Sequence, residues 1–168
     1  IVEVSPRDGL QNEAQFVATE DKLALIERLI ACGLRSIEAT AFVSPKWVPQ
    51  MRDAAELYPL LPKHGACRFP VLVPNIQGYE RARACGVTDI AVFTAASEAF
   101  TLKNINASIA ESLDRFKPVF ERARHDGVRV RGYVSTVLGC PYQGKVEVSA
   151  VVAVSKQLFE LGCYEISL

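Results

Sequence analysis

The segment IVEVSPRDGLQNE, residues 1–13, places a short apolar run directly before a charged turn. If residues 1–4 form a strand, Arg7 and Asp8 lie at its carboxyl end, where a proline and a glycine turn the backbone toward a helix. The carboxyl ends of parallel strands carry the sites of α/β enzymes. A neighbouring aspartate and arginine there can divide the work of a site, in which the carboxylate binds a divalent metal and the guanidinium stabilises an oxyanion. On residue type alone, a solvated ion pair that contributes almost nothing is the more common case.

The composition is that of a globular domain with a sizeable core, because 49% of the 168 residues are hydrophobic and 23% are charged. Nineteen basic residues balance nineteen acidic ones, so no global field attracts nucleic acid or an anionic membrane. No apolar run in the sequence reaches the ~20 residues of a membrane span. We expect a soluble protein whose partners are neither nucleic acid nor membrane.

The cysteines are odd in number and widely spread, and no two of them form a Cys-x-x-Cys pair. We expect buried thiols in a reducing compartment rather than disulfides or a zinc site. Cys140 is the one cysteine to test as a reactive thiol, although no histidine lies beside it in the sequence. The five are Cys32, Cys67, Cys85, Cys140 and Cys163.

Glycines at intervals indicate a repeated helix-to-strand turn, in which each glycine ends a helix-like stretch and an apolar run follows. Glycine suits the left-handed position that closes a helix. Near-continuous apolar strands indicate a parallel sheet that is covered on both faces. The glycines are Gly33, Gly65, Gly86, Gly127 and Gly162, and the predicted strands are 1–4, 36–39, 68–73, 89–93, 129–134 and 164–168.

Five helices are predicted between these strands. Thr19 is the expected N-cap of the first helix, because an acidic pair follows it and suits the positive end of the helix dipole. Pro118 is expected to kink the fourth helix or to mark an early turn of its second half. Strict alternation without a linker predicts a single domain over residues 1–168. The predicted helices are 20–32, 52–57, 77–84, 108–125 and 148–161.

Two architectures fit this alternation of helices and strands: an open doubly wound sheet, and an eight-stranded (β/α)₈ barrel that is cut short. Length favours the open sheet, because a barrel typically needs ~250 residues. The chain nevertheless starts in a strand without an initiating methionine and stops inside another apolar strand at Leu168. Both ends are therefore expected to be trimmed, and the residue pattern alone leaves both architectures open.

Three motifs carry a family resemblance: SPRDGLQNE at 5–13, FVSPKWVPQM at 42–51, and GYVS with GCPY at 132–135 and 139–142. Shorter matches are AASE at 95–98, KNIN at 103–106 and CYEISL at 163–168. Together they resemble the hydroxymethylglutaryl-CoA lyase family, in the DRE-TIM metallolyase superfamily. The resemblance implies an α/β TIM (β/α)₈ barrel, truncated here to about six strands and five helices, with two strands missing.

The resemblance also implies an activity. Members of this family cleave 3-hydroxy-3-methylglutaryl-CoA to acetyl-CoA and acetoacetate with a divalent metal, Mg²⁺ or Mn²⁺. The expected partners are the acyl-CoA substrate and further copies of the chain, in a homodimer or a higher homo-oligomer. The implied roles are leucine degradation and ketone body metabolism. The implied compartment is the bacterial cytoplasm or the mitochondrial matrix.

The family's functional residues correspond to particular positions of this chain. Asp8 matches a metal ligand, Arg7 matches a catalytic arginine that stabilises the enolate, and Glu38 matches a catalytic glutamate that orients the site. Lys46 and Lys103 are weaker candidates for contacts with coenzyme A. The candidates for substrate binding are Arg7, Gln11, Asn104, Tyr133 and Ser167. For Tyr133 and Ser167, on the fifth and sixth predicted strands, the alternative is that they only fill the barrel.

The chain also departs from the family pattern. The family's remaining metal ligands, a His-x-His pair and an asparagine, and its general-acid cysteine on a late glycine-rich loop have no match here. His64 and His125 both precede glycines that are expected to close helices, at the end of the sheet opposite the site. A single carboxylate does not hold Mg²⁺ or Mn²⁺ tightly. Residues 1–168 by themselves are therefore expected to be inactive.

Two alternatives stay beside this hypothesis. Within the enzyme class, the intact protein could be a related 3-hydroxyacyl-CoA lyase or a Claisen-type condensing homologue, although the 42–51 block favours the lyase. From a different class, the chain could be a half-barrel without catalysis that assembles through its open edge. A following strand with His-x-His would decide for the enzyme.

Overall fold

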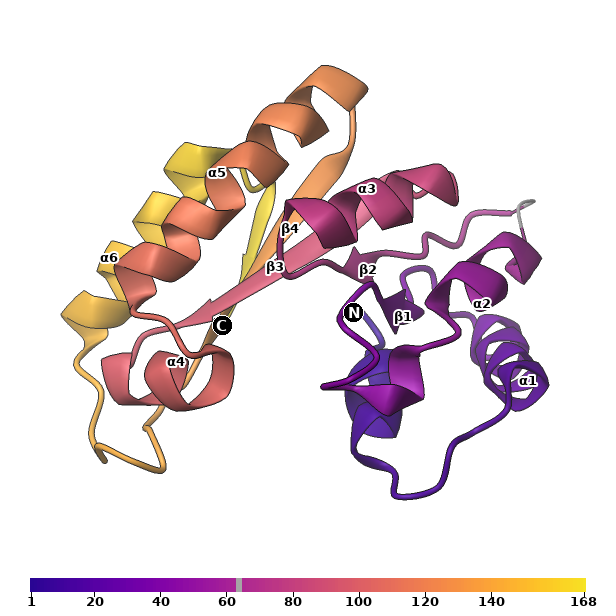
Figure 1. Cartoon of the computed structure of the whole chain (residues 1–168), viewed down its shortest axis with the longest axis horizontal. Helices are drawn as coiled ribbons and strands as arrows, with labels where there is room; N and C mark the ends of the chain where they lie inside the picture. Colours follow the sequence, from indigo (N-terminus) through magenta and orange to yellow (C-terminus); the bar gives the residue numbers. More distant parts are fainter. Residues whose placement is uncertain (63–64) are drawn as a thin grey trace. The chain divides into compact units, whose positions relative to one another are not determined.

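The computed structural model describes residues 1–62 and 65–168, which divide into two compact units (Figure 1). The first unit is Ile1–Ile90 and the second is Ala91–Leu168. Among the described residues, no helix combines the length and the apolar character that a membrane crossing requires.

The strands form a sheet in which they follow one another in chain order, with β3 shared by both units. β1 pairs with β2 in parallel, with Thr40 opposite Val71. β4 pairs with β5 in parallel, with Arg131 opposite Glu165. The bounds are β1 Thr40–Ala41, β2 Val71–Leu72, β3 Asp89–Ala95, β4 Arg129–Ser135 and β5 Glu165–Ser167.

In the first unit, α1 and α2 pack against each other and over the start of the sheet. Their shared core contains Ile26, Ile37, Leu57 and Leu61, all at most 4% exposed. Burying each such side chain stabilises the fold by about 1.5–3 kcal/mol. The helices of this unit are η1 Ser5–Gly9, η2 Leu10–Asn12, α1 Thr19–Ala31, η3 Pro49–Met51, α2 Ala54–Leu60 and α3 Ile76–Ala84.

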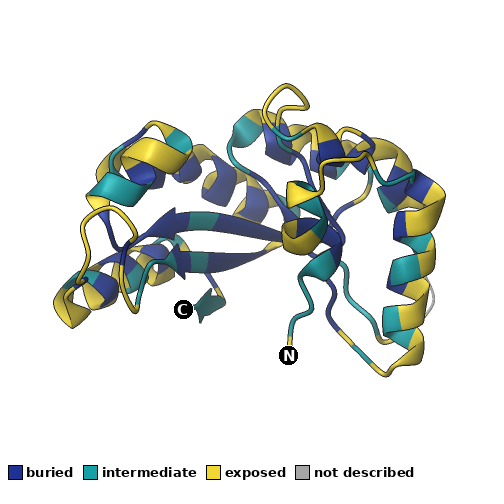
Figure 2. Cartoon of the chain, turned by 90° about the horizontal axis from the view of Figure 1, so that it is seen from below, coloured by how far each residue is buried: buried dark blue, intermediate teal, exposed yellow. Residues whose placement is uncertain are grey.

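In the second unit, α5 and α6 lie side by side on one face of β4 (Figure 1). A Cβ on Gly132 of β4 would lie 3.1 Å from Leu158 Cδ1, so glycine allows α6 to approach the strand closely. β3 and β4 are largely buried, and the helices expose one side to solvent (Figure 2). The helices of this unit are α4 Glu98–Ile105, α5 Ile109–Asp126 and α6 Val148–Leu161.

The structure has five strands among the described residues, so the prediction of six is wrong at the first strand. The predicted strand 1–4 is reduced to one parallel bridge between Glu3 and Ile37. Its pairing stops because the Val4 carbonyl accepts hydrogen bonds from Arg7 N (3.1 Å) and Asp8 N (2.7 Å) and so starts a helical turn. The predicted strand 36–39 is likewise represented by bridges, and the regular strand begins at Thr40.

The helix predictions are confirmed to within three residues at each end, and α6 has the predicted bounds. The predicted Thr19 N-cap is wrong, because Ala18 occupies that position and the Thr19 hydroxyl donates to Asp53 instead, at 2.9 Å. Helix α5 continues through Pro118. Helix α4 was missed, although its capping signal is present: Ser97 Oγ accepts from Phe100 N at 3.2 Å.

The glycine pattern is confirmed at four of its five positions. At Gly127 the backbone closes α5 with φ at +68°, a conformation that side chains disfavour. Gly65 differs, because α2 already ends at Leu60. The four glycines that follow a helix with positive φ are Gly33, Gly86, Gly127 and Gly162.

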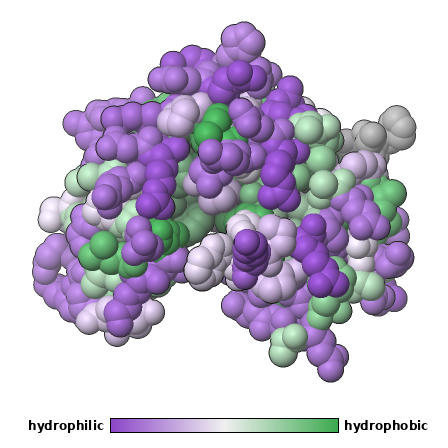
Figure 3. Space-filling view, viewed as in Figure 1, coloured by the Kyte–Doolittle hydropathy of each residue, from purple (hydrophilic) through white to green (hydrophobic). Residues whose placement is uncertain are grey.

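Residues 1–168, expressed alone, are expected to self-associate or aggregate. The strand order leaves β1 and β5 at the edges of the sheet, and open parallel edges pair with other chains. Helix α6 also exposes Val148 and Phe159 at 76% and 68%, and apolar patches interrupt the hydrophilic face in Figure 3. Sedimentation velocity at micromolar concentration measures this. A cooperative folded monomer would contradict the expectation.

Candidate functional site

The first helical turn, η1, positions the charged pair that the sequence singles out. Pro6 lies in its first turn, where a missing N–H costs nothing, and the Val4 carbonyl accepts from Arg7 N and Asp8 N. This geometry turns Arg7 inward, to 9% exposure, while the Asp8 side chain stays 54% exposed. The alternative of a fully solvated ion pair is therefore wrong for Arg7.

Arg7 is held between two carboxylates. Its Nε donates to Glu38 Oε1, and its Nη1 donates to Asp8 Oδ1 at 2.8 Å. Glu38 is completely buried, and a backbone hydrogen bond of 2.7 Å from Glu38 N to Glu3 O fixes its position beside the turn. Removing one partner of such a buried pair leaves an uncompensated charge. The contacts therefore fix the orientation of the guanidinium and place two carboxylates beside it.

Asp8 receives further support from the turn that follows. Gln11 Nε2 donates to Asp8 Oδ1 at 2.9 Å, and Asn12 Nδ2 donates to the Asp8 carbonyl at 3.2 Å. Within the described part of the chain, both side-chain hydrogen bonds to this carboxylate go to Oδ1. Oδ2 is thus the oxygen that could accept a cation or a substrate hydroxyl.

A divalent metal finds too few ligands among the described residues. These residues contain no group of three or more histidine, cysteine or acidic side chains that could hold a metal ion. His125 is 81% exposed and contacts Asp126, and His64 lies outside the described residues. Asp8 alone does not make a magnesium or manganese site, which seeks about six ligands.

The predicted substrate residues of the second unit lie on β4, β5 and α4. Tyr133 and Ser167 are register partners, so they are neighbours on the same face of the sheet. Gly132 faces Leu158 of α6, and because side chains alternate along a strand, Tyr133 and Ser167 lie on the opposite face. Asn104 is exposed on α4. The structure therefore brings two of these three together.

Arg131 is a buried cation that the sequence analysis missed. It is 7% exposed, its Nη1 lies 3.3 Å from Glu165 Oε1, and its guanidinium lies 5.1 Å from the centre of the Tyr133 ring. The sequence does contain a signal that Arg131 lies beside Tyr133: it precedes Tyr133 by two residues, and residues i and i+2 share a face of a strand.

Cys140 lies in a tight turn in which its backbone exchanges hydrogen bonds of 2.7 and 2.9 Å with Gly144. All five cysteines are free, but only Cys140 and Cys163 are buried. The expectation of buried thiols is therefore wrong for Cys32, which is exposed, and for the half-buried Cys67 and Cys85. Burial alone would raise the pKa of the Cys140 thiol, but hydrogen bonds from Ser97 and the loop backbone lower that pKa below its usual value. By contrast, burial raises the pKa of Cys163 to about 12.

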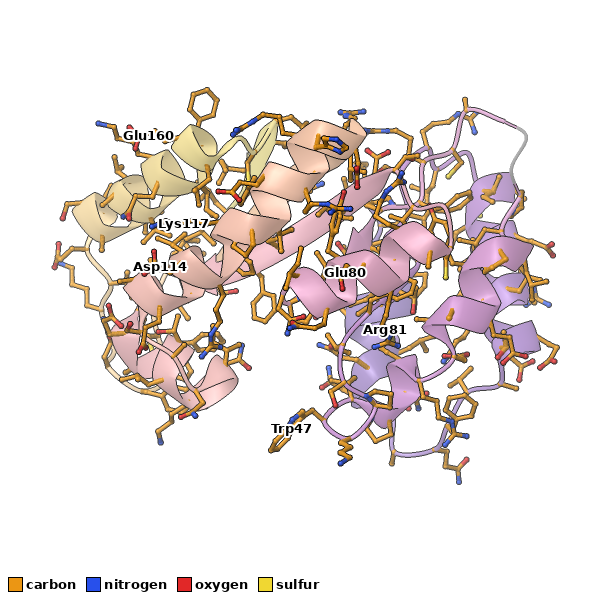
Figure 4. All side chains as sticks on the ribbon, turned by 45° about the horizontal axis from the view of Figure 1, so that its top comes forward. Trp47, Glu80, Arg81, Asp114, Lys117 and Glu160 are labelled. Atoms are coloured by element: carbon orange, nitrogen blue, oxygen red, sulfur yellow. The ribbon has the colours of Figure 1, made fainter. Side chains whose placement is uncertain are left out.

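The loop after β1 carries Lys46 and Trp47, both exposed, and Trp47 projects away from the ribbon (Figure 4). Helix α3 anchors this loop, because Arg81 Nη1 donates to Val43 O at 3.3 Å. A Cβ on Gly78 would lie only 2.7 Å from the Phe42 carbonyl oxygen, so this approach of α3 to the loop requires glycine.

In the other unit, Lys103 Nζ lies 4.5 Å from the Tyr142 ring centre.

The comparison with known families finds one model, described as HMGL-like, that matches residues 1–168. Mitochondrial hydroxymethylglutaryl-CoA lyase of Bos taurus is 55% identical over 168 residues, which are all of this chain and 52% of the bovine protein. Cytoplasmic 3-hydroxy-3-methylglutaryl-CoA lyase of Danio rerio is 56% identical, over all of this chain and 50% of that protein. The chain thus spans about half the length of the curated relatives it matches.

Solved structures show the same likeness. Hydroxymethylglutaryl-CoA lyase from Pseudomonas aeruginosa matches with a TM-score of 0.96 and 53% identity, over 99% of this chain and 56% of that one. An HMG-CoA lyase of A. baumannii, in complex with coenzyme A and 3-methylmalate, matches with a TM-score of 0.92 and 34% identity. The match covers 98% of this chain and 53% of that one. These matches confirm the predicted truncated barrel class, in which the described sheet is not closed.

Replacing Glu38 with alanine in the intact protein is expected to lower the free energy of unfolding by about 3–5 kcal/mol, because the buried Arg7 loses its counter-charge. Urea denaturation measures this. Glu80→Ala, on the exposed face of α3 (Figure 4), is the matched control and should stay within about 0.5 kcal/mol. Equal stabilities of the two variants would show that the Arg7–Glu38 contact contributes nothing.

Proposed function

Because this chain belongs to the HMGL-like family, we propose that the intact protein cleaves 3-hydroxy-3-methylglutaryl-CoA to acetyl-CoA and acetoacetate. Relatives that are 55% and 56% identical carry the names of this lyase. The observation that carries the proposal is the buried Arg7 held by Glu38 and Asp8, because it provides an oriented cation beside an accessible carboxylate.

The reaction breaks one carbon–carbon bond. The tertiary hydroxyl loses its proton, its oxygen forms the ketone of acetoacetate, and the electrons of the broken bond pass to the thioester as an enolate. Protonation of that enolate at carbon yields acetyl-CoA. The barrier therefore depends on removing the hydroxyl proton and on stabilising the enolate oxygen.

Arg7 stabilises the enolate oxygen in this proposal. Its Nε and Nη1 are engaged by Glu38 and Asp8, and Nη2 has no hydrogen bond within residues 1–62 and 65–168. A guanidinium held in this way can donate from Nη2 without reorganising during the reaction. Glu38 acts through Arg7 by fixing its orientation.

Asp8 contributes one metal ligand in this proposal, through Oδ2. A bound Mg²⁺ or Mn²⁺ lowers the pKa of a coordinated hydroxyl. The described residues do not complete such a site, so the further ligands belong to the part of the intact protein beyond the matched half.

Gln11, Asn104, Tyr133 and Ser167 contact the acyl-CoA substrate in this proposal. The support is their polarity and the shared sheet face of Tyr133 and Ser167. The intact protein acts as a homo-oligomer in leucine degradation and ketone body metabolism. Its compartment is the cytoplasm or the mitochondrial matrix in this proposal; the support is that one relative is named mitochondrial and another cytoplasmic.

Replacing Arg7 with lysine or glutamine in the intact protein is expected to lower kcat by about 10² to 10³, with metal affinity unchanged. A point charge on a flexible stem cannot replace a forked guanidinium. Acetoacetate release measures turnover, and Arg115→Lys on the exposed face of α5 is the control. Turnover of the Arg7 variants within a few-fold of the parent enzyme would exclude Arg7 from the reaction.

Asp8→Ala in the intact protein is expected to weaken Mn²⁺ binding at least tenfold and to abolish most activity, because it deletes an anionic ligand. Calorimetric titration measures the affinity, and Asp21→Ala on α1 serves as the exposed control. If Asp8→Ala and the parent protein bind Mn²⁺ equally, Asp8 is not a ligand.

A further inference from the structure

The segment FVSPKWVPQM at 42–51 carries much of the family likeness, yet the proposed reaction uses none of its side chains directly. One of them, Gln50 in η3, is 4% exposed although its side chain is polar. A buried amide without partners would be costly, so its contacts indicate what it does.

Gln50 binds the backbone of a separate segment, residues 13–17. Its Oε1 accepts from Val17 N at 3.1 Å, and its Nε2 donates to Glu13 O at 3.0 Å and also to Gln15 O. One side chain thus satisfies three backbone groups in sequence. Both donor hydrogens and the acceptor oxygen of the amide are used.

Segment 13–17 connects the Arg7–Asp8 turn to helix α1, and Gln50 anchors its backbone. The Phe16 ring of the segment also packs against the cations of Arg52 and Lys22, which lie 3.7 and 4.5 Å from the ring centre. Residues 13–16 are exposed. Across the ranges that the structure describes, the hydrogen bonds of the 13–17 backbone to distant segments all come from Gln50. Glu13 is also tied back toward the turn, because its N–H donates to Leu10 O at 3.0 Å.

A buried ion pair holds Gln50 itself in place. Lys22, 1% exposed, donates from Nζ to the Gln50 carbonyl and lies 2.7 Å from Asp53 Oδ1. Thr19 Oγ1 donates to the other oxygen of Asp53 at 2.9 Å. Both ends of segment 13–17 are therefore held by η3. Gln50 binds the segment directly, and the first turn of α1, which follows the segment, is bound to η3 through Lys22.

We propose that Gln50 is a positioning residue that holds the exit of the Arg7–Asp8 turn through segment 13–17. The proposal deepens the lyase function proposed above and rests on it for its catalytic consequence. Without the amide, Glu13 loses its anchor five residues after Asp8, and the turn can move. Displacements of about 1 Å can cost about 10² in rate, so a defect in geometry here appears in turnover.

Two substitutions in the intact protein separate positioning from packing. Gln50→Ala removes all three hydrogen bonds, and Gln50→Glu keeps the acceptor for Val17 N while placing a carboxylate against two carbonyl oxygens. Val119→Ala, in the buried face of α5 in the second unit, is the control for lost stability. Gln157→Ala, an exposed glutamine on α6, is the control for residue type.

Hydrogen exchange, Mn²⁺ titration and turnover are measured on all four variants. We expect both Gln50 variants to increase amide exchange over residues 5–17, to weaken Mn²⁺ binding at least threefold and to lower kcat at least tenfold. We expect Val119→Ala to lose stability without these changes, and Gln157→Ala to match the parent protein.

The proposal is overturned if exchange in the Gln50 variants rises only at residues 13–17, or if Val119→Ala weakens Mn²⁺ binding as much as they do. If the parent protein itself lacks lyase activity, the proposed function fails. The exchange over residues 5–12 then still decides the role of Gln50, because that measurement needs no turnover.

Discussion

The burial of Arg7 is the constraint on which the first unit's site depends. A guanidinium that is 9% exposed must be neutralised nearby, and Glu38 and Asp8 do this from two sides. Because Glu38 lies 31 residues along the chain, the pair ties the amino-terminal turn to the start of the sheet. The bridge between Glu3 and Ile37 ties the same two segments through the backbone.

The two carboxylates that contact Arg7 differ in their exposure to solvent. Glu38 is fully buried and accepts from Arg7, whereas the Asp8 side chain is 54% exposed and its hydrogen bonds from Arg7 and Gln11 both go to Oδ1. Two carboxylates of similar chemistry can therefore take different tasks, one orienting a cation and one meeting a ligand. Exposure decides between them, as is common where titratable groups are used for catalysis.

The second unit contributes a different kind of constraint, the strict alternation of side chains along β4 and β5. Gly132 admits Leu158 of α6 on one face, and this commits Arg131 and Tyr133 to the other face. Parallel register then brings Ser167 beside Tyr133. The polar face of this pair of strands is thus a direct consequence of close helix packing on the opposite face.

The sequence by itself determined the alternation of helices and strands, four glycine turns and the Arg7–Asp8 pair, because these depend on local conformation and on recognisable motifs. It did not reveal that the first strand shrinks to a bridge at Glu3, since competition for the Val4 carbonyl depends on how the turn folds. Only the tertiary structure decided which polar groups are buried together. Gln50 reaches segment 13–17 from more than 30 residues away, and no local pattern encodes a contact at that separation.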